Sequence, residues 1–382
     1  MAVWTTNHEV EFGERKSPIL DMKLPDDVRF VDFEGNERTP SAKQIVTVND
    51  GRHTLVPLTP APLFLISKDS AALLDALKNA VADDPAMALE AEVKPDLMGT
   101  LNLSLRNLTS LRRSGEVVAG EKTIAYNLPP RGAKTYPIVK GSTKDMKENR
   151  WKGNLLPLFK KPMNVAWFRI PRCGKKPNWS KVPTLPFTAC SGKAKGGKVK
   201  ACAKYAWNKD FLFMRVEVED PEFVPVAESG KKFSPTALYA HDGSLEVYFD
   251  GFGNARTQGE RGYDDDDSRY DLIENHVHRL RAVNMQLAQG TSSATDTEVS
   301  EKLVRSFTRT ATGYVYEVAF AARYMAPVDL KVGTVFGTGV ALHDFTKGVD
   351  GKELCTTISM SVDPDRDLND KPFLLPLAIL GE

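Results

Sequence analysis

The stretch that decides the fold is Phe211 to Asp220, FLFMRVEVED, together with a second one at Asp242 to Asp250, DGSLEVYFD. In both, apolar and polar residues alternate with a period of two, which indicates strands with one buried face. Gly, Pro, Asn and Asp interrupt similar segments along most of the chain, as in antiparallel strands joined by turns. The sequence therefore predicts a mostly β protein.

The chain is expected to divide into tandem antiparallel β-sandwich domains. Residues 1–66 form a small β domain, residues 67–83 a helix and linker, residues 84–172 an immunoglobulin-like sandwich and residues 173–382 one large sandwich. The one clear helical pattern runs from Asp69 to Asp83. A 66-residue β domain buries too little surface to be stable alone, so we expect it to pack on the next segment or on a domain outside this chain.

Composition excludes several classes of protein. The 382 residues are 41% hydrophobic and 26% charged, which excludes disorder as the main state. No run of 18 apolar residues occurs, so no membrane-spanning helix is expected, and the first residues show no secretory signal. A net charge of +1 excludes a wholly basic nucleic-acid binder.

The charge is nevertheless unevenly spread. Between Arg131 and Lys204 there are 19 Lys and Arg residues against two acids, Asp145 and Glu148, a local charge of +17. This span is either a solvated face or a patch for an anionic polysaccharide. Nucleic acid is the remaining alternative, and the span lacks the aromatic interleaving of a single-strand groove. Within it, Gly141 to Lys161 has the composition of a basic loop or linker.

A series of landmarks in the C-terminal part resembles the family 9 carbohydrate-binding modules. The landmarks occur in the family's order, and they are Pro177-Asn178-Trp179, Ala206-Trp207 with the strand ending at Asp220, the strand from Asp242 to Asp250, Gly262-Tyr263 with the acidic run, Gly313-Tyr314 with Glu317, and His343-Asp344. They cover about 55% of the chain. The resemblance implies a DOMON-like β-sandwich that holds saccharide on one polar face.

Five residues are candidates for that saccharide site, and they are Tyr239, His241, Glu246, Arg269 and Tyr270. Aromatic rings stack on sugars, and carboxylates and Arg bind their hydroxyls. The family's two sandwiching tryptophans are absent here, because their positions fall at Ala240 and near Leu368. The family's arginine aligns with Asp271, although Arg269 is close.

The densest carboxylate cluster is Asp264, Asp265, Asp266 and Asp267. Adjacent acids repel unless they are solvated or neutralised, and oxygen ligands in a loop suit Ca²⁺. The resemblance also implies structural calcium, so this run is either a Ca²⁺ site or a solvated loop.

Other candidate chemistry has a simpler explanation. Glu246, Asp250 and Glu317 could form a general acid/base pair, but carboxylates that alternate with core residues more often face solvent, calcium or a ligand. His276 and His278 lack a third metal ligand in sequence. Cys190 and Cys202 bracket a hairpin loop, and they could pair if the protein is exported.

Residues 1–66 resemble the β-domain that follows the catalytic barrel of many glycoside hydrolases. The chain is therefore interpreted as a non-catalytic accessory region of an exported carbohydrate-active enzyme whose catalytic domain lies upstream. Its expected ligand is a polysaccharide or oligosaccharide, either neutral or anionic. Its expected location is extracellular, periplasmic or at the cell surface. The alternatives are a structural or interaction region without a sugar site and a self-contained hydrolase.

Overall fold

The structure is a computed structural model of the chain. It describes residues 2–3, 19–48, 51–58, 61–82, 88–141, 149–192, 199–232, 240–254, 266–283, 286–287, 302–347, 353–363, 366, 368 and 372–382. The chain divides into two compact units, and each is described by itself. Unit 1 comprises residues 1–92, 103–136 and 154–161, and unit 2 comprises residues 93–102, 137–153 and 162–382.

Unit 1 begins with two small four-stranded sheets. The first has the order β1 (Ala2–Val3), β7 (Leu63–Ile66), β3 (Arg29–Asp32) and β4 (Glu37–Arg38). The second has the order β5 (Ile45–Val48), β6 (Gly51–Pro57), β2 (Ile19–Met22) and β8 (Val81–Ala82). A shared apolar core lies between them, with Met22, Val56, Leu65 and Leu73 as central members.

Helix α2 (Ser70–Lys78) is shorter than the sequence predicted. Its start agrees, because the Asp69 side chain accepts a hydrogen bond from Ala72 N at 2.9 Å and caps the helix. The predicted end at Asp83 is wrong. Val81 and Ala82 pair with β2 instead, and a β-branched valine is well suited to a strand.

The N-terminal β domain packs on the following segment of unit 1, as its small size predicted. Asp21 on β2 accepts a hydrogen bond from Ser110 N at 2.5 Å and lies 2.9 Å from His53 Nδ1. The Arg131 guanidinium lies 3.3 Å from the same imidazole and donates to Leu108 O. A buried polar network therefore joins the two parts.

The middle of the chain is built from six longer strands. They are β9 (Leu89–Pro95), β10 (Thr100–Asn107), β11 (Arg113–Ala119), β12 (Lys122–Leu128), β13 (Ala133–Lys140) and β14 (Arg150–Leu156). The order β13-β10-β9 forms one sheet, and β12, β11 and β14 are neighbours in another.

The expected basic linker from Gly141 to Lys161 is partly wrong. Residues 142–148 lie outside the described part, but Arg150–Leu156 is strand β14 and pairs with β11. Leu155 is fully buried there. The strand was not predicted because Gly153 and the adjacent Leu155 and Leu156 interrupt the apolar alternation.

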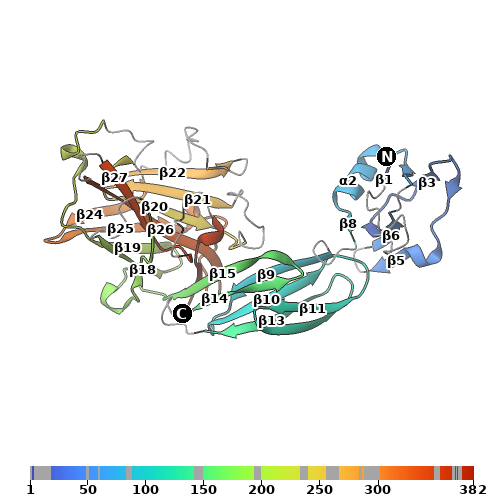
Figure 1. Ribbon diagram of the computed structural model, residues 1–382, viewed down its shortest axis with the longest axis horizontal. Coiled ribbons are helices and arrows are strands. Elements are labelled where there is room, and N and C mark those ends of the chain that lie inside the picture. Colours follow the sequence, from blue (N-terminus) through green and yellow to red (C-terminus); the bar gives the residue numbers. More distant parts are fainter. Residues whose placement is uncertain are drawn as a thin grey trace. The chain divides into compact units, whose positions relative to one another are not determined.

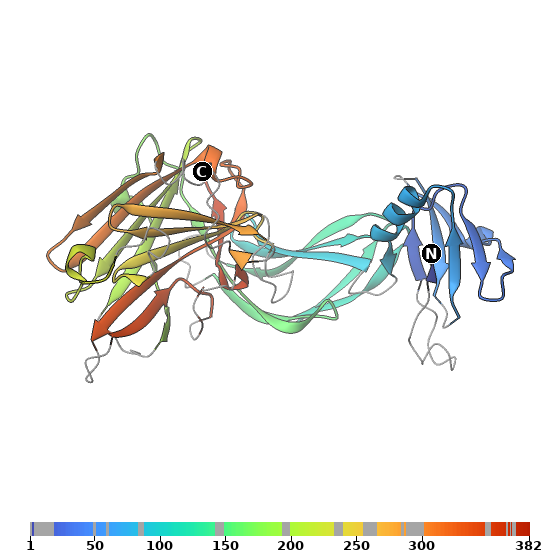
Figure 2. The ribbon, with the colours of Figure 1, turned by 90° about the horizontal axis from the view of Figure 1, so that it is seen from above.

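Unit 2 ends in a large two-layer β-sandwich (Figures 1 and 2). One layer has the order β16 (Leu185–Pro186), β18 (Lys200–Trp207), β19 (Phe211–Glu219), β25 (Gly313–Ala321) and β24 (Val304–Arg309). The other has the order β15 (Phe159–Ile170), β28 (Leu377–Leu380), β26 (Val335–Lys347), β20 (Ser244–Asp250), β21 (Asp267–Ile273), β22 (His276–Val283) and β23 (Gln286–Leu287). In addition, β27 (Glu353–Ser359) pairs with β26, and β17 (Ala189–Gly192) pairs with β27.

Short 3-10 helices occur at η1 (Ala42–Gln44), η2 (Trp179–Lys181), η3 (Val226–Glu228), η5 (Ala322–Tyr324) and η6 (Pro372–Leu374). The core between the two layers contains Trp207, Val216, Val247, Tyr270 and Phe320. The mostly β prediction and the large C-terminal sandwich are confirmed, whereas the domain boundaries remain predictions. Among the described residues, no helix has the length and apolar character needed to cross a membrane.

Candidate functional site

The sheet that contains β20, β21 and β26 has two distinct faces. Leu245, Val247 and Phe249 point into the sandwich core. Side chains alternate along a strand, so Glu246 and Tyr248 lie on the opposite face. That face is buried too, because every residue of β20 is buried. It carries the polar residues of interest.

Arg269 on β21 holds two carboxylates on this face. Its Nη1 lies 3.2 Å from Glu246 Oε1. Its Nε lies 2.7 Å from Asp271 Oδ1, and its Nη2 donates to Asp271 Oδ2 at 3.1 Å. The side chains of the three residues are between 2% and 6% exposed. The result is a buried, two-sided charge network.

Two further side chains complete the network around Glu246. His343 Nε2 on β26 lies 3.2 Å from Glu246 Oε2. The Tyr248 hydroxyl donates to the same oxygen at 2.5 Å, and the other ring nitrogen of His343 lies 3.1 Å from Thr357 Oγ1. We call Glu246, Tyr248, Arg269, Asp271 and His343 the polar network.

The surroundings favour the charged forms of Glu246 and His343 but disfavour the charged form of Asp271. Burial opposes ionisation of Glu246, but His343, Arg269 and Tyr248 outweigh it and lower the pKa of Glu246 to about 2. Burial also opposes protonation of His343, yet hydrogen bonds to Cys355 and Glu246 raise its pKa to about 10. Burial and the Glu246 charge raise the pKa of Asp271 to about 7, against the effect of Arg269.

Access to the network is uneven. Glu246 and Arg269 are 4% and 6% exposed, whereas the side chain of His343 is 12% exposed. Apolar side chains approach the sheet near Tyr248. A Cβ built on Gly339, the partner of Tyr248, would lie 2.8 Å from Leu368 Cδ1 and 3.1 Å from Leu375 Cδ2. A ligand would therefore first meet the network at His343.

Comparison with known proteins agrees with this architecture. Residues 175–364 match the family model described as carbohydrate family 9 binding domain-like. The chain contains a family 9-like domain. Among curated proteins, no relative matches the sequence.

Two solved structures resemble the family 9-like domain. Both are described as a carbohydrate binding module family 9 from Caldicellulosiruptor kristjanssonii. One is in complex with cellotriose, with 16% identity, a TM-score of 0.39 and coverage of 56% of this chain and 93% of the other. The second is in complex with glucose, with 17% identity, a TM-score of 0.39 and coverage of 56% and 96%.

The family 9-like domain brings together only part of the predicted saccharide site. Glu246 and Arg269 meet in the polar network. Tyr270 lies on the core face, where its ring packs against Phe249 and Phe320 at centroid distances of 5.9 and 5.0 Å. His241 is buried just before β20, and Tyr239 lies outside the described residues.

Sequence reasoning did not foresee the roles of Tyr248, Asp271 and His343 in the family 9-like domain. The alternation along β20 places Tyr248 on the face of Glu246, so that signal was present in the sequence. Asp271 and His343 reach this face through the pairing of β20 with β21 and β26. Sequence alone does not specify that pairing.

The predicted acidic run is only partly described. Asp264 and Asp265 lie outside the described residues. Asp266 and Asp267 meet Asp250, with one carboxylate oxygen from each residue lying within 4.8 Å of the others. Asp266 Oδ2 accepts a hydrogen bond from Phe252 N at 2.7 Å, and Asp250 Oδ1 accepts one from Asn254 N at 3.2 Å.

A second acidic cluster escaped the sequence analysis. Asp220, Asp242 and Asp344 are buried and place one carboxylate oxygen each within 4.8 Å of one another. Burial raises the pKa of Asp242 to about 6 and that of Asp344 to about 7. Each is the first or the last residue of a landmark quoted above, but no sequence signal brought the three together.

The hypothetical acid/base residues Glu246, Asp250 and Glu317 are not brought together, since Asp250 meets Asp266 and Asp267 instead. Glu317 lies on β25 in the other layer, where its carboxylate is 2.7 Å from Arg215 Nη1. The cysteines that had been considered for a disulfide, Cys190 and Cys202, are both free. They lie on β17 and β18, which belong to different sheets.

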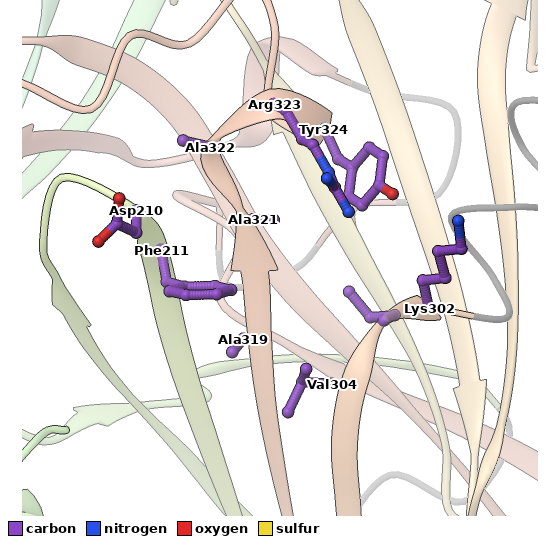
Figure 3. A pocket seen from close by; sticks show the side chains of 10 residues that line it. Asp210, Phe211, Lys302, Val304, Ala319, Ala321, Ala322, Arg323 and Tyr324 are labelled. Atoms are coloured by element: carbon purple, nitrogen blue, oxygen red, sulfur yellow. The ribbon is translucent and has the colours of Figure 1, made fainter. Parts of the chain in front are cut away.

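A surface pocket of about 430 Å³ lies on the layer opposite the polar network (Figure 3). Phe211, Ala319 and Val304 supply apolar lining. Arg323 lies over the ring of Tyr324 at 4.7 Å, and Lys302 also lines the pocket. The pocket belongs to β19, β24 and β25 and shares no residue with the network.

Proposed function

We propose that the family 9-like domain binds saccharide and that the polar network forms the floor of its site. A domain of this family implies carbohydrate binding. The observation that supports this location is the convergence of a carboxylate pair, a guanidinium and an imidazole on one sheet face. A buried charge network costs desolvation that apolar side chains would avoid, so it is a candidate for function rather than for stability.

The network has the chemistry to bind sugar hydroxyls. Glu246 and Asp271 are acceptors, Arg269 and His343 are donors, and the Tyr248 hydroxyl is both. Above pH 7 the two carboxylates offset the two cations, so a neutral sugar is favoured over a carboxylated or sulfated one. His343 is the most exposed of these side chains and would make the first contact.

We also infer that the chain is a non-catalytic accessory region of an exported carbohydrate-active enzyme, acting outside the cell or in the periplasm. The matched family is one of binding domains. Both carboxylates of the network form ion pairs with Arg269. An upstream catalytic domain is part of this proposal.

Calcium at the acidic run remains part of the proposed function. Asp266 and Asp267 would hold the ion together with Asp250 from the end of β20, because the oxygens of these three residues converge. Oxygen donors of this kind suit Ca²⁺. The ion would hold the loop after β20 against the start of β21.

Calorimetric titration with neutral and anionic oligosaccharides tests saccharide binding. We expect heat with a neutral glycan, and we expect Glu246→Gln and His343→Asn each to weaken binding by more than about tenfold, since each loses a hydrogen-bonding charge. Glu217→Gln is the matched control, because Glu217 forms its ion pairs on the other layer with Lys204 and Arg215.

The outcomes separate the alternatives. If folded protein releases no heat with any glycan and no glycan changes its melting temperature, the chain would instead be a structural or interaction region. If Glu217→Gln weakened glycan binding as much as Glu246→Gln does, the saccharide site would not lie at the polar network. Hydrolysis of a glycoside by this chain, lost in Glu246→Gln, would show an enzyme instead.

A further inference from the structure

The surface pocket on β19, β24 and β25 has the size and the lining of a ligand site (Figure 3). Its volume of about 430 Å³ falls within the range of about 300–1,000 Å³ that is usual for small-molecule sites. Neither the polar network nor the two acidic clusters contribute a residue to it. A ligand of this pocket would therefore bind independently of the polar network.

Aromatic rings and small side chains form the apolar part of the pocket. Phe211 and Phe213 lie on the same face of β19, with ring centroids 5.7 Å apart. In the pairing of β19 with β25, Phe211 lies opposite Ala321, and Phe213 lies opposite Ala319. Alanines leave the rings open on this side, and Val304 beside them is 63% exposed. Accessible rings of this kind pack on the apolar face of a sugar.

Two cations and one carboxylate complete the lining. They belong to Arg323, Lys302 and Asp210. Figure 3 shows the alanines of β25 between Phe211 on one side and Lys302 on the other. The lining therefore carries one net positive charge, which favours a ligand with a negative charge.

The segment that carries Arg323 is held in place from both layers of the sandwich. Ala322 N donates a hydrogen bond to Asp210 O at 2.8 Å, which fixes η5 to the turn before β19. Tyr324 O accepts a hydrogen bond at 3.0 Å from Nη2 of the buried Arg279 on β22. The guanidinium of Arg323 lies 4.7 Å from the centroid of the Tyr324 ring. This side of the pocket is thus preorganised for a ligand.

Exposed lysines lie next to the pocket. Lys209 belongs to the turn between β18 and β19. In the same turn, Asn208 Nδ2 donates to Gly174 O at 3.0 Å, which places Lys175 and Lys176 beside it. Among the described residues, none of these three lysines forms an ion pair. The lysines after Gly174 belong to the basic span for which an anionic polysaccharide was one interpretation of the sequence.

We propose that this pocket is a second saccharide site and that it binds a sugar residue with one negative charge, either a carboxylate or a sulfate ester. The Phe211 ring packs on the sugar. Arg323 donates two hydrogen bonds to the acid group, and Lys302 adds its charge. Asp210 accepts hydrogen bonds from sugar hydroxyls.

NMR titrations of the full chain with small sugars test the proposal. The probes are methyl glucuronoside, glucose 6-sulfate and, as the neutral control, methyl glucoside, and the alanine methyl groups of the protein carry ¹³C. We expect at least one charged probe to bind more than about fivefold more tightly than methyl glucoside and to shift the methyl resonances of Ala319 and Ala321. This advantage should disappear in about 0.5 M NaCl. Comparison of the two charged probes distinguishes a carboxylate from a sulfate.

Two substitutions and a matched control assign the binding to named side chains. Arg323→Gln should weaken binding of the charged probe by about fivefold or more and leave methyl glucoside unaffected, whereas Phe211→Ala should weaken all three probes. Arg309→Gln is the control, because it removes a guanidinium that lies over the Phe223 ring on the same layer, outside the pocket. Both arginines are exposed, so both variants should keep the melting temperature of the unchanged protein.

Three results would overturn the proposal. One is charged probes that bind no more tightly than methyl glucoside. Another is Arg323→Gln protein that binds them as the unchanged protein does. The third is self-association of the chain that Phe211→Ala abolishes, because a second copy would then cover this face. Glu246→Gln changes the polar network alone and should leave the pocket intact, so the two saccharide proposals can fail separately.

Discussion

Glu246 and Arg269 form an ion pair across the neighbouring strands β20 and β21, with 3.2 Å between Oε1 and Nη1 and with side chains 4% and 6% exposed. Asp271 shares the same guanidinium. Removing the cation from such a buried pair leaves carboxylates uncompensated, which is far more costly than breaking an exposed pair.

Replacement of Arg269 by Met should therefore destabilise the protein strongly. We expect the free energy of unfolding to fall by about 3–5 kcal/mol, because two buried carboxylates lose their cation. Urea denaturation followed by tryptophan fluorescence measures it. Arg215→Met is the control, since that 27% exposed side chain pairs with Glu217 and Glu317 and should cost about 1 kcal/mol or less. If both variants lost the same free energy of unfolding, the ion pairs of Arg269 would contribute no more than exposed ion pairs do.

Acid should weaken the C-terminal domain through Glu246. Its pKa is about 2 in the folded protein, below its ordinary value of 4.5. A lowered folded-state pKa contributes stability above pH 4.5 that disappears as pH falls toward 2, by up to about 3 kcal/mol. Urea denaturation at several pH values between 7 and 3 should show the difference between the unchanged protein and Glu246→Gln shrinking with acid. A difference independent of pH would contradict the assignment.

Alanine substitutions at two glycines with positive φ distinguish the cost of backbone strain from the cost of steric crowding. Gly243 has φ +73°, and a Cβ there would lie 2.5 Å from Phe223 Cε2 and 2.8 Å from the Tyr314 hydroxyl oxygen. Gly230 has φ +67° with nothing within 4 Å. Gly230→Ala should cost about 1 kcal/mol from backbone strain alone, and Gly243→Ala about 3 kcal/mol because overpacking adds to it. Thermal unfolding that ranks them equally would argue against the close packing at Gly243.

The polar link inside unit 1 predicts a localised effect. Asp21→Ala removes the acceptor of Ser110 N and the partner of His53, both buried, and should lower stability by about 2–3 kcal/mol. Differential scanning calorimetry should show a lower unfolding temperature for unit 1, with unit 2 unchanged. Asp26→Ala is the matched control, because Asp26 is 99% exposed and lies 3.9 Å from Arg52. If Asp26→Ala lowered the unfolding temperature of unit 1 as much as Asp21→Ala does, the hydrogen bonds of Asp21 would not stabilise this unit.

Much of the fold could be predicted because strand alternation is a local property. The alternating stretch from Phe211 to Asp220 forms β19 up to Glu219, and the stretch from Asp242 to Asp250 contains β20 from Ser244 onward. Errors arose where the local signal was missing or ambiguous. In β14, Gly153 and the adjacent Leu155 and Leu156 interrupt the alternation, and after α2 the apolar Val81 continues a helical pattern although it pairs with β2.

The candidate site was less predictable because it depends on register. Tyr270 and Arg269 are adjacent in sequence, and a shift of one residue in the pairing of β20 with β21 would exchange their faces. The observed register pairs Tyr248 with Arg269 and Val247 with Tyr270. It therefore sends Arg269 to the polar face and Tyr270 to the core.

The sequence by itself determined the strands, their buried faces and the family of the C-terminal domain, because side-chain alternation and ordered landmarks are written along the chain. Only the tertiary structure decided that His343 reaches Glu246 and that Asp220, Asp242 and Asp344 converge. These residues are up to 124 positions apart, and the contacts between them exist only once two sheets have paired and packed.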